Sequence, residues 1–203
     1  MTALPRCAAL VLVITSLHFG DAAAQHFSLR PQVGVYIPTK DLIAVSQTGE
    51  VGKLKAGPSF GAALGIRFGS HFGIEATGAY VPTTFSLGSG NSFQKQDAKL
   101  FIGSALAVLY ALPRTSFVNL YLSGGVGVIS HGGVAFTSQA KTSDVAGVGG
   151  AGALISLGGI TLTAGVDAFR YTSSYSGSQQ NTSELKQLDL QLKLGLGFGV
   201  GGK

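Results

Sequence analysis

Ser130, His131 and Asp144 are the residues of this chain whose types could support acyl-transfer chemistry. A serine nucleophile, a histidine base and a carboxylate would have to be held together at one edge of the fold. His26 and His71 stand near the start of the mature chain and in a short connection, so neither can join this group. Catalysis is therefore a hypothesis that depends on His131 alone, and we expect no enzyme activity.

A second motif has the spacing of a dinucleotide-binding loop: Gly147, Gly149 and Gly152, with Asp167 twenty residues after the first glycine. Such a loop needs a buried strand before it and a helix after it. The preceding residues, TSQAKTSD, are polar, and Gly158-Gly159 would end the helix within six residues. We therefore interpret the motif as glycine-rich strand sequence and expect no cofactor and no metal.

The uncharged stretch between Asp144 and Asp167 fits two strands better than one helix. Its 22 residues include seven glycines, and each would cost a helix about 1 kcal/mol relative to alanine. As strands, the stretch breaks at Gly158-Gly159, a typical two-residue hairpin turn. The clearest strand, QLDLQLKLGLGFGV at 187–200, alternates over 14 positions. That length indicates a membrane wall, because a tilted membrane-crossing strand needs roughly 9 to 11 residues and a soluble strand averages about 5 to 6.

The same alternation predicts eight strands joined by connections of alternating length. The long connections are 38–57, 86–97, 131–144 and 172–186, and the short ones are 69–71, 112–115 and 158–159. Outer-membrane barrels have short periplasmic turns and longer external loops. We therefore expect an all-β fold: a closed, antiparallel, eight-stranded, transmembrane up-and-down β-barrel with both termini in the periplasm. The expected strands are 27–37, 58–68, 72–85, 98–111, 116–130, 145–157, 160–171 and 187–200.

Several charged residues fall on the small and polar face of these strands, which would line the barrel lumen. Eight strands leave an interior about wide enough for side chains alone. An unpaired charge in a closed, poorly hydrated interior is costly, so we expect ion pairs that fill the lumen in preference to a solute pathway. The residues expected in these pairs are Arg30, Arg67, Glu75, Asp167, Asp189 and Lys193.

Aromatic residues are expected to form two belts where the barrel wall meets the two membrane interfaces. The belt beside the short turns would contain Phe68, Phe72, Phe117 and Phe198. The belt toward the long loops would contain Tyr36, Tyr80, Phe85, Tyr110, Phe169 and Tyr171.

The first residues have the layout of a secretory signal peptide. Arg6 precedes the apolar run CAALVLVITSL, and three alanines precede an expected cleavage site before Gln25. We therefore expect a signal peptide at 1–24 and one barrel domain at 25–203. Cleavage would remove Cys7, the one cysteine, and so exclude disulfides and cysteine-ligated metals. Charged residues make up 11% of the sequence, about half of the usual share, as expected if lipid covers much of the surface.

The chain resembles the small eight-stranded outer-membrane barrels of the OmpA and OmpX type, the outer membrane protein beta-barrel domain. The most specific element is KLGLGFGV in the last strand, which is similar to the signal read by the outer-membrane assembly machinery. Family members usually end on the aromatic residue, whereas here Gly201-Gly202-Lys203 follows. The residues of this assembly signal are Lys193, Gly195, Phe198 and Val200.

The resemblance implies a monomer in the outer membrane of a Gram-negative-type bacterium, inserted by the assembly machinery and surrounded by outer-membrane lipid. Basic residues outnumber acidic ones in the expected external loops, which favours contact with lipopolysaccharide phosphates. The loops lack the basic and aromatic interleaving of a nucleic-acid site, so no nucleic-acid partner is expected.

Three functions remain open. The first is a structural or surface-interaction barrel with a packed lumen and four extracellular loops. The second is a narrow channel, or a barrel that binds a small ligand or a lipid. The third is a lipid A-modifying enzyme, although SHGG at 130–133 lacks the one-residue spacing between His and Ser of barrel deacylases. A soluble periplasmic lipid-binding barrel is a separate alternative.

Overall fold

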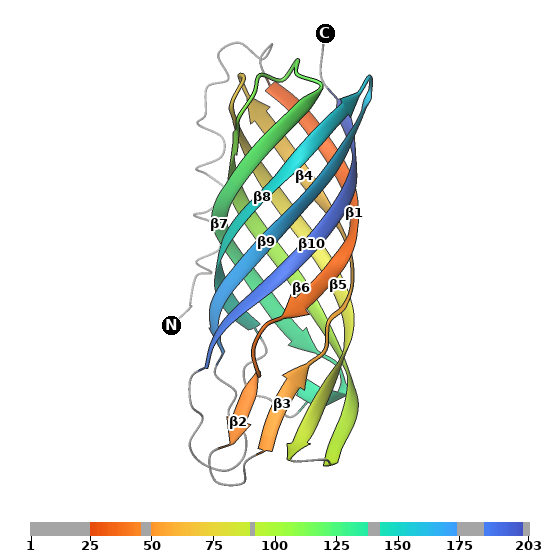
Figure 1. The fold of residues 1–203 in the computed structure, drawn as a ribbon, viewed down its shortest axis with the longest axis vertical. Coiled ribbons are helices and arrows are strands. Elements are labelled where there is room, and N and C mark those ends of the chain that lie inside the picture. The colour runs from red at the N-terminus through yellow and green to blue at the C-terminus, as the bar shows by residue number, and fades with distance from the viewer. Residues whose placement is uncertain (1–24, 46–49, 90–91, 138–142, 174–184, 201–203) are drawn as a thin grey trace, which may run out of the picture.

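Eight long strands form the wall of a closed antiparallel barrel in the described part of the chain (Figure 1). The computed structural model describes residues 25–45, 50–89, 92–137, 143–173 and 185–200, so the expected signal peptide at 1–24 lies outside it. Neighbouring wall strands follow one another along the chain, and β1 pairs with β10 to close the barrel. The expected all-β, eight-stranded, up-and-down fold is confirmed. The wall strands are β1 (Gln25–Pro38), β4 (Gly57–Phe68), β5 (Phe72–Ser89), β6 (Ser92–Tyr110), β7 (Val118–Gly132), β8 (Ser143–Leu157), β9 (Ile160–Ser173) and β10 (Leu185–Val200).

Tight turns join the strands at the end of the barrel where β1 begins and β10 ends (Figure 1). Leu157 pairs with Ile160 across Gly158-Gly159, so the uncharged stretch does divide into two strands at this point. Gly158 has a φ of 69°, a left-handed conformation that glycine adopts without steric cost. Short turns face the periplasm in barrels of this kind, and we call this end the periplasmic end.

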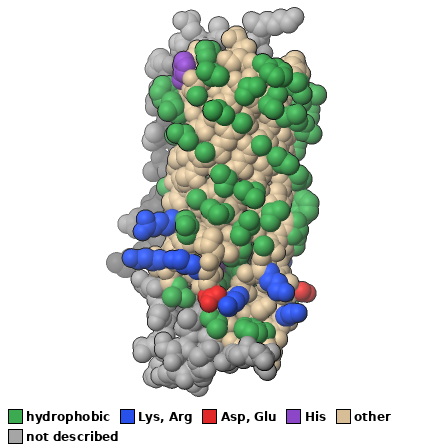
Figure 2. Space-filling view, in the orientation of Figure 1, with side chains coloured by type: hydrophobic (Ala, Val, Ile, Leu, Met, Phe, Trp, Pro, Cys, Tyr) green, Lys and Arg blue, Asp and Glu red, His purple; other side chains and the backbone are tan. Residues whose placement is uncertain are grey.

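The outer face of the wall is apolar. Leu64, Leu122 and Leu194 are 59%, 62% and 61% exposed, because alternate side chains of a strand point to opposite faces of the sheet. Figure 2 shows hydrophobic side chains over the length of the wall, with basic side chains gathered toward the opposite, external end. Lipid is the solvent that such a wall requires, because soluble monomers rarely expose apolar patches larger than a few hundred Å².

The external end is more ordered than expected. Strands β5 and β6 continue past the barrel as one hairpin up to the pairing of Ser89 with Ser92. Two short strands, β2 (Ile43–Val45) and β3 (Glu50–Leu54), lie beside it, and β3 pairs with β5 (Figure 1). The expected loops 38–57 and 86–97 are therefore partly sheet, because pairing to a neighbouring strand satisfies the backbone even where the side chains are polar.

A short 3-10 helix, η4 (Val134–Phe136), follows β7. Phe136 of η4 is buried against Phe85 of β5, with ring centroids 5.4 Å apart. No helix among the described residues is long and apolar enough to span a membrane.

One of the two expected aromatic belts is wrong. The residues by the short turns do face outward, since Phe72 and Phe117 are 65% and 63% exposed. Of the belt expected toward the long loops, however, only Tyr80 lies on the outer wall. The other five are buried, and Tyr110 lies by the short turn after β6 instead of toward the long loops. These five residues occupy inward positions of the strand alternation: Tyr36, Phe85, Tyr110, Phe169 and Tyr171.

Candidate functional site in the barrel lumen

Two buried ion pairs lie on the lumen side of the wall, one between adjacent strands and one between strands separated by a third. Arg30 of β1 donates to Glu75 of β5, and both side chains are 6% exposed. The ammonium nitrogen of Lys193 on β10 lies 2.5 Å from a carboxylate oxygen of Asp167 on β9, with side-chain exposures of 4% and 2%. Each charge therefore has its counter-charge within hydrogen-bonding contact, which is the arrangement a buried ion needs.

The strand register and a glycine make room for the second pair. Asp167 pairs with Gln191, so Lys193 lies one inward position along β10 from it. On the other side of β9, Asp167 pairs with Gly150. A Cβ at Gly150 would collide with the carboxylate of Asp167 and the hydroxyl of Ser123, so the absence of a side chain at this point positions Asp167 toward the lumen.

Among the described residues, tyrosines and not a cation hold Asp189. Its carboxylate oxygen accepts hydrogen bonds from the hydroxyls of Tyr36, at 2.5 Å, and Tyr171, at 2.7 Å. The backbone amide of Thr39 donates to the other oxygen at 3.4 Å. The expectation had placed Asp189 in an ion pair. Period-two alternation places both tyrosines on the inward face, but alternation carries no signal that they would meet Asp189.

Aromatic side chains close the external mouth of the barrel. Phe136 packs against His131 as well as Phe85, with ring centroids 5.4 Å apart in each pair. His131 also contacts Tyr171 at 6.4 Å between centroids. We call Phe85, His131 and Phe136 the aromatic cap. The ion pairs, Asp189 and the cap therefore place buried side chains at successive heights inside the barrel.

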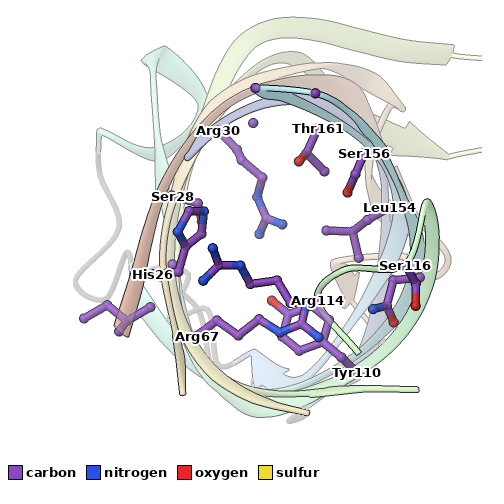
Figure 3. A pocket seen from close by; sticks show the side chains of 16 residues that line it. His26, Ser28, Arg30, Arg67, Tyr110, Arg114, Ser116, Leu154, Ser156 and Thr161 are labelled. Atoms are coloured by element: carbon purple, nitrogen blue, oxygen red, sulfur yellow. The ribbon is translucent and has the colours of Figure 1, made fainter. Parts of the chain in front are cut away.

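The periplasmic end of the lumen is open and forms a cavity of about 420 Å³ (Figure 3). We call this cavity the vestibule. Arg67, another residue expected in an ion pair, lies here. Its guanidinium donates to the backbone oxygens of Ser70 and Leu112, and its carbon lies 3.9 Å from the centre of the Tyr110 ring. Arg30, Arg67 and Arg114 all project into the opening.

The three residues of the acyl-transfer hypothesis do not assemble at a membrane rim. His131 and Asp144 are 3% and 4% exposed inside the lumen. Ser130 lies at the adjacent position, so its side chain is on the other face of the strand, where its hydroxyl lies 2.7 Å from that of Ser143. A nucleophile and its base cannot cooperate from opposite faces of one wall. In the described chain, no group of three or more His, Cys, Asp or Glu residues could hold a metal ion.

The residues of the expected assembly signal divide between the two faces of β10. Lys193 is engaged with Asp167 inside the lumen, whereas Phe198 is 45% exposed on the outer wall. Gly195 is half-buried between them, and the side chain of Val200 lies outside the described residues.

Known structures with the same architecture identify the fold. No protein-family model and no curated protein matches the chain. The crystal structure of the outer membrane protein OprG from Pseudomonas aeruginosa matches it with a TM-score of 0.70 and 16% sequence identity, over 89% of this chain and 98% of that one. The chain has the fold of the small outer-membrane β-barrels. This barrel also matches Ail, the attachment invasion locus protein of Yersinia pestis, in complex with the heparin analogue sucrose octasulfate. That match has a TM-score of 0.47 and 14% identity, over 86% of this chain and 99% of Ail.

The resemblance inferred from the sequence is thus confirmed at the level of the fold. A barrel of this fold with an apolar wall belongs in the outer membrane of a Gram-negative-type bacterium.

Proposed function

We propose that this small outer-membrane barrel is a structural or surface-interaction protein with a non-conducting lumen. The observation that supports the proposal is the stack of layers between the two mouths. A solute entering from the periplasmic end would meet the Arg30–Glu75 pair, then Lys193–Asp167, then Asp189 and the aromatic cap. Separating a buried pair costs several kcal/mol per ion, which supports a lumen without a continuous aqueous path.

The external end supplies the surface through which such a barrel would act. Strands β1, β5, β7 and β9 all end at this end of the barrel. The β5–β6 hairpin projects farther than the barrel wall and is joined by β2 and β3, which stiffens it (Figure 1). We infer that these connections present a partly rigid surface to the outside of the cell.

Outward basic residues support contact with lipopolysaccharide. Arg170 of β9 and Lys186 of β10 are exposed on the lipid side near the external end, and Lys186 pairs with Thr172. Together with Ser143 they line a groove of about 480 Å³ on the outer wall. Guanidinium and ammonium groups with neighbouring hydroxyls donate hydrogen bonds to phosphate oxygens. We propose that lipopolysaccharide phosphates bind in this groove.

The biogenesis of the chain is proposed on the sequence alone. Residues 1–24 would be a cleaved export signal, and 25–203 would be the inserted domain. We propose that the assembly machinery recognises the last strand through Lys193, Gly195, Phe198 and Val200, and that the barrel functions as a monomer without nucleic-acid partners or enzyme activity.

Conductance measurements test the non-conducting lumen. Full-length protein would be expressed, purified in detergent and checked for folding by the heat-dependent shift of its gel mobility. In planar bilayers, folded protein should insert without stepwise current, while a general porin in the same set-up supplies the positive control. Reproducible single-channel steps from the folded fraction would overturn the proposal in favour of a narrow channel. Fractionation of the producing cells should place the protein with the outer membrane, and recovery in the soluble periplasm would favour the secreted alternative.

A further inference from the structure

The vestibule carries an excess of positive charge. Arg30, Arg67, Arg114 and His26 line it, and none of the described residues that line it is acidic. Glu75 neutralises Arg30 from deeper in the lumen. Within the described part of the chain, neither Arg67 nor Arg114 forms an ion pair. The guanidinium groups of these two residues therefore face the cavity without a counter-charge.

Three side chains that line the vestibule each carry a nitrogen without a hydrogen-bond partner. Arg30 is 5% exposed, and its Nε is buried without a hydrogen-bond partner. The Nε of Arg67 and the Nδ1 of His26 are likewise buried and unpartnered. All three side chains line the same cavity (Figure 3). An anion bound there would balance the positive charge of the guanidinium groups around it.

Arg67 is held in position before any ligand arrives. One guanidinium nitrogen donates to the carbonyl oxygens of Ser70 and Leu112, and the group stacks on the Tyr110 ring. Stacking and backbone contacts fix the plane of the guanidinium, which leaves its remaining edge available to a planar or tetrahedral oxyanion. Neutral hydrogen-bonding groups complete the wall: Ser28, Ser116, Asn119, Ser156 and Thr161.

We propose that the vestibule is a binding site for a small phosphate ester that enters from the periplasm. A phosphate monoester carries close to two negative charges at neutral pH, which matches the two unneutralised guanidinium groups. Its three terminal oxygens accept several hydrogen bonds at once, which suits the guanidinium and hydroxyl groups that line the vestibule.

The size and position of the vestibule restrict the ligand further. A volume of about 420 Å³ is at the low end of the range for small-molecule sites, roughly 300 to 1,000 Å³. The cavity lies inside the wall, so the acyl chains of a membrane lipid would have to leave the bilayer to bring a headgroup into it. The site therefore fits a soluble sugar or glycerol phosphate. This inference goes beyond the proposed function, because binding in a blind vestibule requires no passage through the barrel.

Calorimetric titration of the folded, full-length protein in a non-ionic detergent tests the site. Glycerol 3-phosphate is the probe, and glycerol is the uncharged control. We expect saturable binding of glycerol 3-phosphate that weakens as salt is added, and no binding of glycerol. Arg67→Gln and Arg114→Gln should each weaken binding about tenfold or more, since each removes a charge-assisted contact.

Lys55→Gln is the matched control, because it removes one positive charge from an exposed position just after β3, away from both the vestibule and the outer groove. It should bind the probe like the unaltered protein. Arg114 is exposed in a turn, so its variant should fold even if the Arg67 variant does not. Absence of saturable binding, or an Arg114→Gln variant that binds unchanged, would overturn the proposal.

The source of the phosphate is tested in nanodiscs. Phosphatidylglycerol in the disc should not displace glycerol 3-phosphate, because the lipid headgroup cannot reach the vestibule. Displacement would overturn the assignment to a soluble ester. A conducting barrel with an intact binding site would contradict the proposed function alone, which keeps the two proposals separable.

Discussion

Arg30 and Glu75 form an ion pair across a strand that separates them. Arg30 belongs to β1 and Glu75 to β5, and β4 lies between these two strands in the sheet. Their side chains therefore meet inside the lumen and not along the wall. Both are 6% exposed, so each charge depends on the other for its neutralisation.

Replacing Glu75 by Gln should destabilise the barrel by about 3–5 kcal/mol, because it leaves the guanidinium of Arg30 buried without a counter-charge. A double variant, Arg30→Met with Glu75→Leu, should lose less than the single change, since it leaves no orphan charge. Urea titration of protein refolded into lipid vesicles measures the free energy of unfolding. The exposed Asp97 supplies the control, and Asp97→Asn should stay within about 0.5 kcal/mol. An unchanged free energy for Glu75→Gln would count against a structural ion pair.

Tyr36→Phe and Tyr171→Phe should each lower stability by about 1.5–3 kcal/mol, because each removes a hydrogen bond to the buried carboxylate of Asp189. Removing both hydroxyls should cost more than the sum of the single changes, since Thr39 at 3.4 Å would be the remaining recorded donor. The same urea titration gives the coupling through a double-mutant cycle. Tyr80→Phe on the outer wall is the control. Strictly additive losses would show that the two hydroxyls act independently.

The sequence predicts the wall well and its contents less well. Alternation works for the wall because each strand position faces either lipid or lumen, as the exposed Leu194 and buried Lys193 illustrate. Which inward charges meet depends on the stagger between strands, and alternation alone does not show that Arg30 and Glu75 meet past the strand between them. Asp189 was expected to need a cation, but a carboxylate is also stabilised by hydroxyl donors.

The external mouth is the part that sequence reasoning missed. Phe136 lies in a connection between strands, where no alternation of side chains predicts which of them are buried. Its burial depends on β5 extending beneath it. The β5–β6 hairpin escaped notice because its tip, SLGSGNSFQ at 86–94, has the composition of a loop. Arg114 of the vestibule stands in a short turn, where an inward-facing charge has no periodic signal.

Gly165→Ala should destabilise the barrel by about 1–3 kcal/mol through overpacking, because its Cβ would collide with the hydroxyl of Tyr121. Tyr121→Phe removes that oxygen, so adding it to Gly165→Ala should recover part of the loss. Gly149→Ala is the matched control, since its Cβ would meet nothing within 4 Å. Urea titration of the four proteins tests the contact. A loss for Gly165→Ala that Tyr121→Phe does not reduce would mean that the strain arises elsewhere.

Arg170→Gln combined with Lys186→Gln should weaken the association of the barrel with lipopolysaccharide, because both charges line the outer groove that Ser143 and Thr172 complete. Each lost contact to a phosphate should reduce affinity by about tenfold or more. Co-purification with lipopolysaccharide, titrated in non-ionic detergent at increasing salt, measures the effect. Lipid A lacking its phosphates should bind the unaltered protein as weakly as normal lipid A binds the double variant. The basic pair Lys53 and Lys55 lies on and just after β3, beyond the wall, so replacing both by Gln changes the charge equally without touching the groove. If that control variant loses as much lipopolysaccharide as the groove variant, the attraction comes from overall charge and the groove is not a site.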